Sequence, residues 1–348
     1  MTLPGLIGVE IIFSDACAVE PENPLVDFYW GDPPQSIEFR YCVMELLLKF
    51  FESLPPGGRI RSLSIQGLQN RNEPDVTDTS SFKSLLSSLT SLELHIVTEN
   101  VPSAPSQNIL LPEVEQFGDE LLPHWLEPST ASLTQLTLLG CDAELGFWPR
   151  IDLRSIEYPN LRKLALGFFT FAYDWQFEWI FKHAATLELL YLDSCSILYA
   201  RCNDTPIDAE DHPGNSRFVV FERRWHQFFD RLTAGALPCL SDFRMGGYCY
   251  GRVEYVSSVP RTDVHHGFGL LERRLHDNMY VAFNCGNGSS QFSSALNTTE
   301  YFRGLPESER GRFAFPQCRE EDEAAFGRLL GRLSLLKYSV PKGQDHLD

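Results

Sequence analysis

One leucine-centred motif, L-x-x-L-x-L, recurs along this chain and limits what the chain can fold into. Its matches begin at residues 6, 60, 89, 133, 161, 187 and 240, with other apolar residues replacing some leucines. In such a stretch the fourth and sixth residues point inward from a short strand, and the first leucine leads the chain into that strand. One unit cannot bury its apolar side alone, whereas stacked units share a continuous core. The motif therefore predicts an array of neighbouring strands.

Candidate helices precede four of these stretches, at residues 39–54, 81–89, 174–187 and 222–237. The motifs at 133, 161 and 187 are 28 and 26 residues apart, which is typical of leucine-rich repeats, and longer intervals indicate insertions. We predict an α/β fold, a single leucine-rich-repeat-like solenoid of irregular helix–strand units with a curved parallel sheet. It covers residues 1–338, is clearest over 60–245 and less regular over 246–338, and is followed by a frayed tail at 339–348.

Two motifs end on a cysteine at their ninth position, Cys141 and Cys195. The chain leaves the strand there, and a thiol can donate a weak hydrogen bond to backbone groups in the turn. A reactive thiol would require an exposed, electropositive setting, and Asp193 near Cys195 indicates the opposite. We expect both to be buried structural thiols. The nine cysteines include no C-x-x-C pair, which favours a reducing compartment over a disulfide framework or a zinc site.

The net charge of −18 over 348 residues argues against binding to nucleic acid or to an anionic membrane surface. The amino-terminal stretch lacks the basic region of a secretory signal, and no apolar run approaches the roughly 20 residues that span a bilayer. We therefore expect a cytoplasmic or nuclear protein. A local group of arginines is expected to pair with nearby acids: Arg223, Arg224, Arg231, Arg244, Arg252, Arg261, Arg273 and Arg274.

Residues 147–200 resemble the degenerate leucine-rich-repeat region of fungal F-box-type proteins, and residues 271–288 are similar to the segment that often follows it. The resemblance implies repeats that hold a protein substrate, joined to an F-box that docks on a Skp-type adaptor of a cullin–RING ubiquitin ligase. Residues 44–55 are interpreted as an ordinary repeat helix, because they run directly into the strand at 60 and leave no room for the other F-box helices. No F-box is recognisable. We also expect the strand at 6–11 to expose a core edge, so that a preceding segment or a partner is needed there.

The third and fifth positions of each motif should point away from the core, onto the concave face of the sheet. We predict that a protein partner binds there, although an ordinary solvated strand surface is the alternative for most of these residues. Tyr191 is the one aromatic residue in the row and hence the first to mutate. The predicted partner-binding residues are Glu93, His95, Gln135, Lys163, Tyr191, Asp193, Asp242 and Arg244.

Catalytic motifs are lacking, and we expect no enzyme activity, cofactor or metal. The rival hypothesis is an enzyme within residues 246–318 that uses His265, His266 or Cys285. Asp263 would complete a zinc ligand set with the two histidines on paper, but adjacent histidines point in different directions. A third alternative is a truncated copy without an adaptor role. Residues 319–333 predict a helix that caps the array, and residues 201–217 predict a second contact region.

Overall fold

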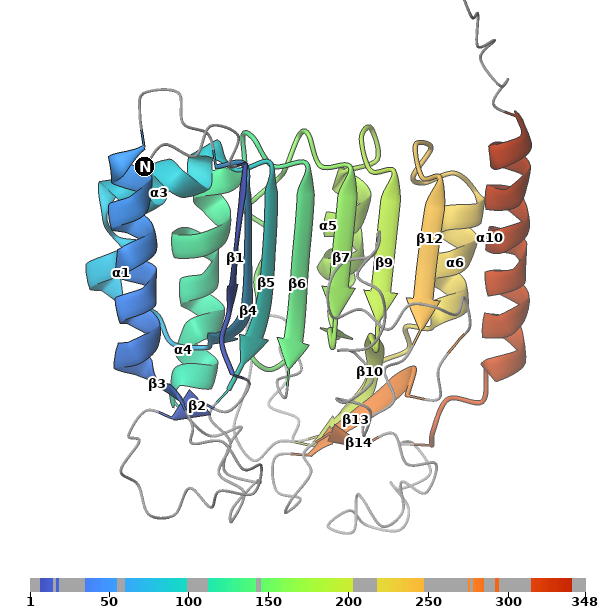
Figure 1. Cartoon of the computed structure of the whole chain (residues 1–348). Helices are drawn as coiled ribbons and strands as arrows, with labels where there is room; N and C mark the ends of the chain where they lie inside the picture. The colour runs from blue at the N-terminus through green and yellow to red at the C-terminus, as the bar shows by residue number, and fades with distance from the viewer. Residues whose placement is uncertain are drawn as a thin grey trace, which may run out of the picture.

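The computed structural model describes residues 7–14, 17–18, 35–54, 60–98, 112–141, 145–202, 218–246, 275, 278–284, 292–293 and 314–339. Its main feature is a seven-stranded parallel sheet in which the strands follow one another in chain order (Figure 1). The strands are β1 (Gly8–Ile12), β4 (Ser62–Gln69), β5 (Ser91–Val97), β6 (Gln135–Cys141), β7 (Lys163–Gly167), β9 (Leu189–Asp193) and β12 (Asp242–Gly246). Each strand coincides with one match of the leucine motif, so the prediction of these strands is confirmed.

The two faces of the sheet differ in chemistry because side chains alternate along each strand. One face carries two apolar rows that run across the sheet and join the main core. The first row is Leu63, Leu92, Leu136, Leu164, Leu190 and Phe243, and the second is Ile65, Leu94, Leu138, Leu166, Leu192 and Met245. The opposite face, which we call the polar face, carries the positions in between. The predicted alternation of inward and outward positions is confirmed.

Helices supply the other half of the core. The helices at the predicted positions are α1 (Ile37–Ser53), α3 (Ser80–Ser88), α5 (Asp174–Lys182) and α6 (Trp225–Thr233). The side chains of Ser36 and Thr79 each accept a 3.2 Å hydrogen bond from a first-turn N–H of α1 or α3, which satisfies a donor that has no partner within the helix. In Figure 1, α5 and α6 stand behind the strands, and α1 stands beyond the β1 edge.

The carboxyl-terminal helix α10 (Arg319–Ser339) closes the far end of the sheet. It packs against α6 and touches β12, which is the last strand (Figure 1). Phe326, Leu329 and Leu333 are buried in the main core, and Leu330 packs against it at partial burial. The capping helix predicted for residues 319–333 is therefore confirmed, and it extends six residues further.

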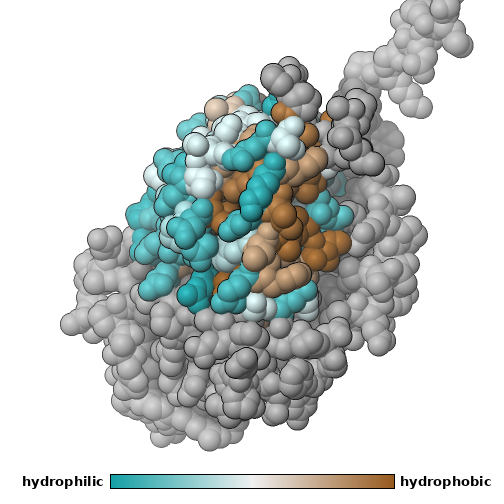
Figure 2. All heavy atoms as spheres, turned by 60° about the vertical axis from the view of Figure 1, so that its left-hand side comes forward, coloured by the Kyte–Doolittle hydropathy of each residue, from teal (hydrophilic) through white to brown (hydrophobic). Residues whose placement is uncertain are grey.

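The opposite end of the sheet is apolar and exposed. Strand β1 is the edge strand of the described sheet and pairs there with β4. Ile7, directly before β1, is 68% exposed, and Ile12 at its end is 55% exposed; Phe39 and Leu46 are 50% and 64% exposed on α1. Figure 2 shows this end as an apolar patch bordered by polar side chains. The need for a preceding segment or a partner at this end stays a prediction.

The long intervals between motifs contain elements that the motif does not predict. Between β5 and β6 lie α4 (Pro112–Leu121), a π-helical turn (Leu122–Leu126) and a short 3-10 helix (Glu127–Ser129); α2 (Pro74–Thr77) follows β4. A short pair joins β2 (Cys17–Ala18) and β3 (Gln35–Ser36). A separate sheet contains β8 (Thr170–Phe171), β10 (Ser196–Cys202), β11 (Phe218–Val220), β13 (Tyr280–Asn284) and β14 (Phe292–Ser293). The prediction of one sheet was therefore incomplete, because β10 pairs with strands from distant parts of the chain.

The link between β6 and β7 contains no helix over its described residues 145–162, yet it is firmly packed. The indole N–H of Trp179 donates to the Ile156 carbonyl at 3.0 Å, and the Tyr158 hydroxyl donates to the Leu126 carbonyl at 3.2 Å. These bonds satisfy buried polar groups, and the rings of Tyr158 and Trp179 pack edge to face with their centroids 6.5 Å apart.

Cys195 is fully buried at the end of β9, where its thiol lies 3.4 Å from the Leu166 carbonyl oxygen and 3.5 Å from that of Asp193. Burial raises the pKa of this thiol well above its usual range, so the group stays neutral. The prediction that Cys195 is a structural thiol is confirmed. The side chain of Cys141 lies outside the described part of the structure.

Candidate functional site on the polar face of the sheet

The polar face collects the predicted partner-binding residues in two rows that cross β4 to β12. The register aligns the first row as Ser62, Ser91, Gln135, Lys163, Leu189 and Asp242. It aligns the second row as Ser64, Glu93, Thr137, Ala165, Tyr191 and Arg244. His95 and Asp193 follow one step further along their strands. All eight predicted residues thus share one face, because parallel strands in register place equivalent motif positions side by side.

Tyr191 is the centre of the most connected part of this face. Its ring lies between two cations, with Arg244 at 5.0 Å and Lys163 at 5.7 Å from the ring centroid. Its hydroxyl donates to Asp242 at 3.2 Å, and the same carboxylate accepts from Arg244 Nε at 2.9 Å. Three neighbouring strands therefore contribute one compact group of opposite charges around an aromatic ring.

Tyr191 is also only 5% exposed, and it packs with Leu139 and Ala165 in a small apolar cluster on this face. The expected free aromatic anchor is therefore largely buried in the chain itself. Mutation of Tyr191 alone would disturb packing as well as any contact with a partner, which makes its neighbours better probes of binding.

Glu93 and His95 form a second buried pair, on β5. Their side chains lie 2.8 Å apart, and the residues are 9% and 5% exposed. Lys163 stands two strands away. Burial lowers the pKa of Lys163, the charge of Arg244 lowers it further, and the charge of Glu93 raises it. The cluster therefore holds both charge signs close together at low exposure, where electrostatic interactions are stronger than in water.

Exposure across the polar face is graded. Gln135 is exposed, and the side chain of Arg244 is 28% exposed; Lys163 is half-buried. Asp193 is fully buried and accepts a hydrogen bond from the Ser194 hydroxyl at 3.3 Å. Lys163, Arg244 and Gln135 are consequently the side chains that an incoming molecule can reach, whereas Asp193 serves the turn after β9.

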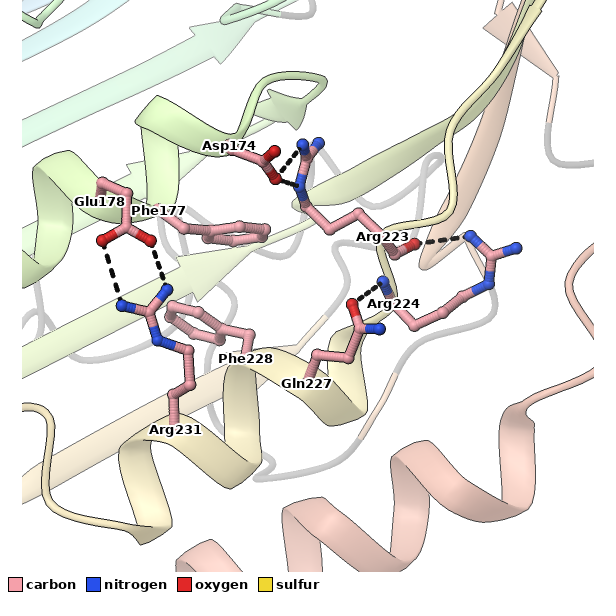
Figure 3. Close-up of a pocket in the computed structure, with 8 residues that line it drawn as sticks. All are labelled: Asp174, Phe177, Glu178, Arg223, Arg224, Gln227, Phe228 and Arg231. Carbon is pink, nitrogen blue, oxygen red and sulfur yellow. Dashed lines mark hydrogen bonds and ion pairs between the residues drawn. The ribbon is translucent and has the colours of Figure 1, made fainter.

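A groove between α5 and α6 lies on the helical side of the protein (Figure 3). Its volume is about 150 Å³, and its floor is formed by the stacked rings of Phe177 and Phe228, whose centroids are 4.7 Å apart. Arg223 pairs with Asp174 on one side, and Figure 3 shows the second pair, Arg231 with Glu178, on the other.

Arg223 and Arg231 therefore pair with acids of α5, as expected for the arginine group, and Arg244 likewise pairs with Asp242. Arg224 differs, since it donates to the carbonyls of Phe221 and Arg223 and lies over the Tyr280 ring. The charged side chains of this groove thus contact other groups of the chain and join the two helices. They do not indicate a particular ligand.

Several sequence predictions fall on residues outside the described part of the chain. They are His265, His266, Asp263, Cys285, the contact region 203–217, and Arg252, Arg261, Arg273 and Arg274. The structure therefore gives no geometry for the rival catalytic hypothesis. Among the described residues, no helix is both long enough and apolar enough to cross a membrane.

Comparisons with protein-family models, with curated proteins and with solved structures return no match for this chain. The resemblance of residues 147–200 to fungal F-box-type repeats therefore stays a prediction.

Proposed function

We propose that this chain is a leucine-rich-repeat-like solenoid that recognises a protein partner through the polar face of its sheet. The strictly sequential order of seven parallel strands, each formed by one leucine motif, supports the solenoid. A helical capping element packed at one end, on β12 and α6, supports it further, because a stacked array requires a closed end.

The observation that carries the recognition hypothesis is the charged group around Tyr191. Lys163, Tyr191, Asp242 and Arg244 come from three strands and are fixed by one another through a hydrogen bond, an ion pair and two cation–π contacts. Such mutual support holds side chains in one conformation before a partner arrives, which reduces the entropy lost on binding. An ordinary solvated strand surface has no need for this order.

The accessible members of the group indicate the chemistry of the partner. Lys163 and Arg244 present positive charge in a chain whose net charge is −18, and Gln135 beside Lys163 adds an amide. The acids of the group, Glu93 and Asp242, are mostly buried beneath or beside them. We infer that a polar partner segment with both donor and acceptor groups binds here, because Lys163 and Arg244 each lie near an acid of the same face.

We further propose that the chain is the substrate-binding part of an F-box-like ubiquitin-ligase receptor, as the resemblance of residues 147–200 implies. The test is affinity purification of the tagged chain from its own cells, with and without an inhibitor of cullin activation, followed by mass spectrometry. Recovery of a Skp-type adaptor and a cullin supports the ligase role. Their absence from a folded, recovered chain contradicts it and leaves the recognition proposal to be tested by itself.

The recognition proposal is tested on the recovered partner with the double variant Lys163→Ala/Arg244→Ala. The matched control is Lys49→Ala/Arg328→Ala, which removes the same charge from exposed positions on α1 and α10. We expect the first variant to weaken binding at least tenfold while the control leaves it unchanged, with melting temperatures measured for both. Equal binding by the two variants would show that the polar face is not the contact surface.

A further inference from the structure

Three side chains with metal-ligating atoms meet where α10 begins. His226 is the second residue of α6, Cys318 directly precedes α10, and Asp322 lies in the first turn of α10. The ligand atoms His226 Nδ1, Cys318 Sγ and Asp322 carboxylate oxygen all lie within 4.8 Å of one another. Cys318 and Asp322 are four residues apart, and therefore they share one side of the helix.

The individual distances are close to those of a zinc site. His226 Nδ1 is 3.1 Å from Asp322 Oδ1, and Cys318 Sγ is 3.4 Å from Asp322 Oδ2. A tetrahedral zinc ion with bonds of about 2.0–2.3 Å separates its ligand atoms by about 3.3–3.7 Å. The three ligand atoms lie within 4.8 Å of one another, so the side chains would draw closer together to share one ion.

The carboxylate of Asp322 lies in a setting that suits a metal ligand. This carboxylate is fully buried, and its hydrogen-bond partners are the backbone N–H and ring of His226, the hydroxyl of Tyr280 at 2.7 Å and the thiol of Cys318. No lysine or arginine pairs with it in the described part of the chain. Buried carboxylates are normally paired with a cation or coordinate a metal.

We propose that His226, Cys318 and Asp322 bind a divalent metal ion of the zinc class that fastens α10 to α6. The nitrogen, sulfur and oxygen donors match the ligand preferences of zinc, and the thiol proton is released to solvent when the metal–sulfur bond forms. The His226 side chain is 27% exposed, so one side of the site is open for metal entry and for a water ligand. Tyr280 then orients Asp322 through its hydrogen bond, as outer residues orient metal ligands elsewhere.

The same atoms also form a closed set of hydrogen bonds without an ion when the His226 ring donates from Nδ1, so the experiment separates these two states. The full chain is incubated with Zn²⁺, passed over a chelating resin, and analysed for retained metal. Co²⁺ is titrated in parallel, because its absorption spectrum reports thiolate coordination. The variants are His226→Gln and Cys318→Ser, and the matched control is Cys239→Ser, which replaces an exposed thiol elsewhere.

We expect about one equivalent of zinc in the wild type and in the control, and at least a tenfold loss of affinity in both site variants. Chelation should also lower the melting temperature of the wild type, since a ligand that binds the folded state stabilises it. Circular dichroism verifies the fold, and His226→Gln serves if Cys318→Ser does not fold. A wild type that retains no zinc, or site variants that retain as much as the control, would overturn the proposal.

Discussion

Replacement of Tyr191 should lower the free energy of unfolding through two separate losses, that of the hydroxyl and that of the ring. Tyr191→Phe removes only the hydrogen bond to Asp242, which still accepts from Arg244. We expect it to lower the free energy of unfolding by about 1 kcal/mol, the usual net value of one hydrogen bond. Tyr191→Ala also removes a ring that is only 5% exposed and its contacts with two cations. We expect a loss of about 3–4 kcal/mol, as for other large aromatic side chains in cores.

The assay is urea unfolding followed by circular dichroism, with both variants and the wild type at equal concentration. A double-mutant cycle with Asp242→Asn isolates the hydroxyl–carboxylate interaction, because the two residues are in direct contact. We expect a coupling energy of about 0.5–1.5 kcal/mol between Tyr191→Phe and Asp242→Asn.

A cost below about 1 kcal/mol for Tyr191→Ala would refute the packing argument, because a buried ring cannot be removed so cheaply. Tyr191 would then be a surface residue, as the sequence first suggested, and the order of the polar face would need another explanation. Additive effects in the cycle would remove Asp242 as the partner of the hydroxyl.

Three further predictions concern thiols, protonation and backbone space. A thiol reagent should label exposed Cys239 in the folded chain, whereas Cys195, which is buried with a raised pKa, should react only after unfolding. Mass spectrometry of labelled peptides checks this. Rapid labelling of Cys195 in the folded chain would contradict its burial. Burial lowers the pKa of His183 below its usual 6.5, so the unfolded state takes up the proton first as the pH falls. The free energy of unfolding should therefore be fully present above about pH 6.5 and fall by up to about 1.4 kcal/mol per pH unit below it. Urea titrations at several pH values check this, and His183→Gln should make the slope flatter. Gly118→Ala on α4 should be strongly destabilising, because its Cβ would overlap a backbone carbonyl oxygen. The Cβ of Gly327→Ala on α10 meets nothing within 4 Å, so this variant should stabilise the chain by up to about 1 kcal/mol. Equal melting temperatures for the two variants would contradict the packing of α4.

Short-range patterns were sufficient to find the main sheet. Each of the seven strands lies on one leucine motif, and the helices α1, α3, α5, α6 and α10 lie where apolar residues repeat at helical spacing. Both signals depend on neighbours two to four residues apart, which the sequence displays directly. The alternation within a strand likewise placed all eight predicted partner-binding residues on one face.

The second sheet could not be found in this way. Its strand β10 follows β9 after only two residues and pairs with β13 about 80 residues later. No repeat in the local sequence predicts this pairing. The burial of Tyr191 was missed for a similar reason. A motif position states which face a side chain occupies, whereas its exposure depends on everything else that packs on that face.

The sequence by itself determined the strands, their order and the division of the sheet into an apolar and a polar face, because these follow from period-two alternation and from stacking of like units. Only the tertiary structure decided which charges meet. Arg244 reached Tyr191 through the register of β12 on β9, and Asp322 reached His226, 96 residues away, through the packing of α10 on α6. Such sites depend on distances in space that spacing along the chain does not encode, and therefore the proposed metal site has no signature in the sequence.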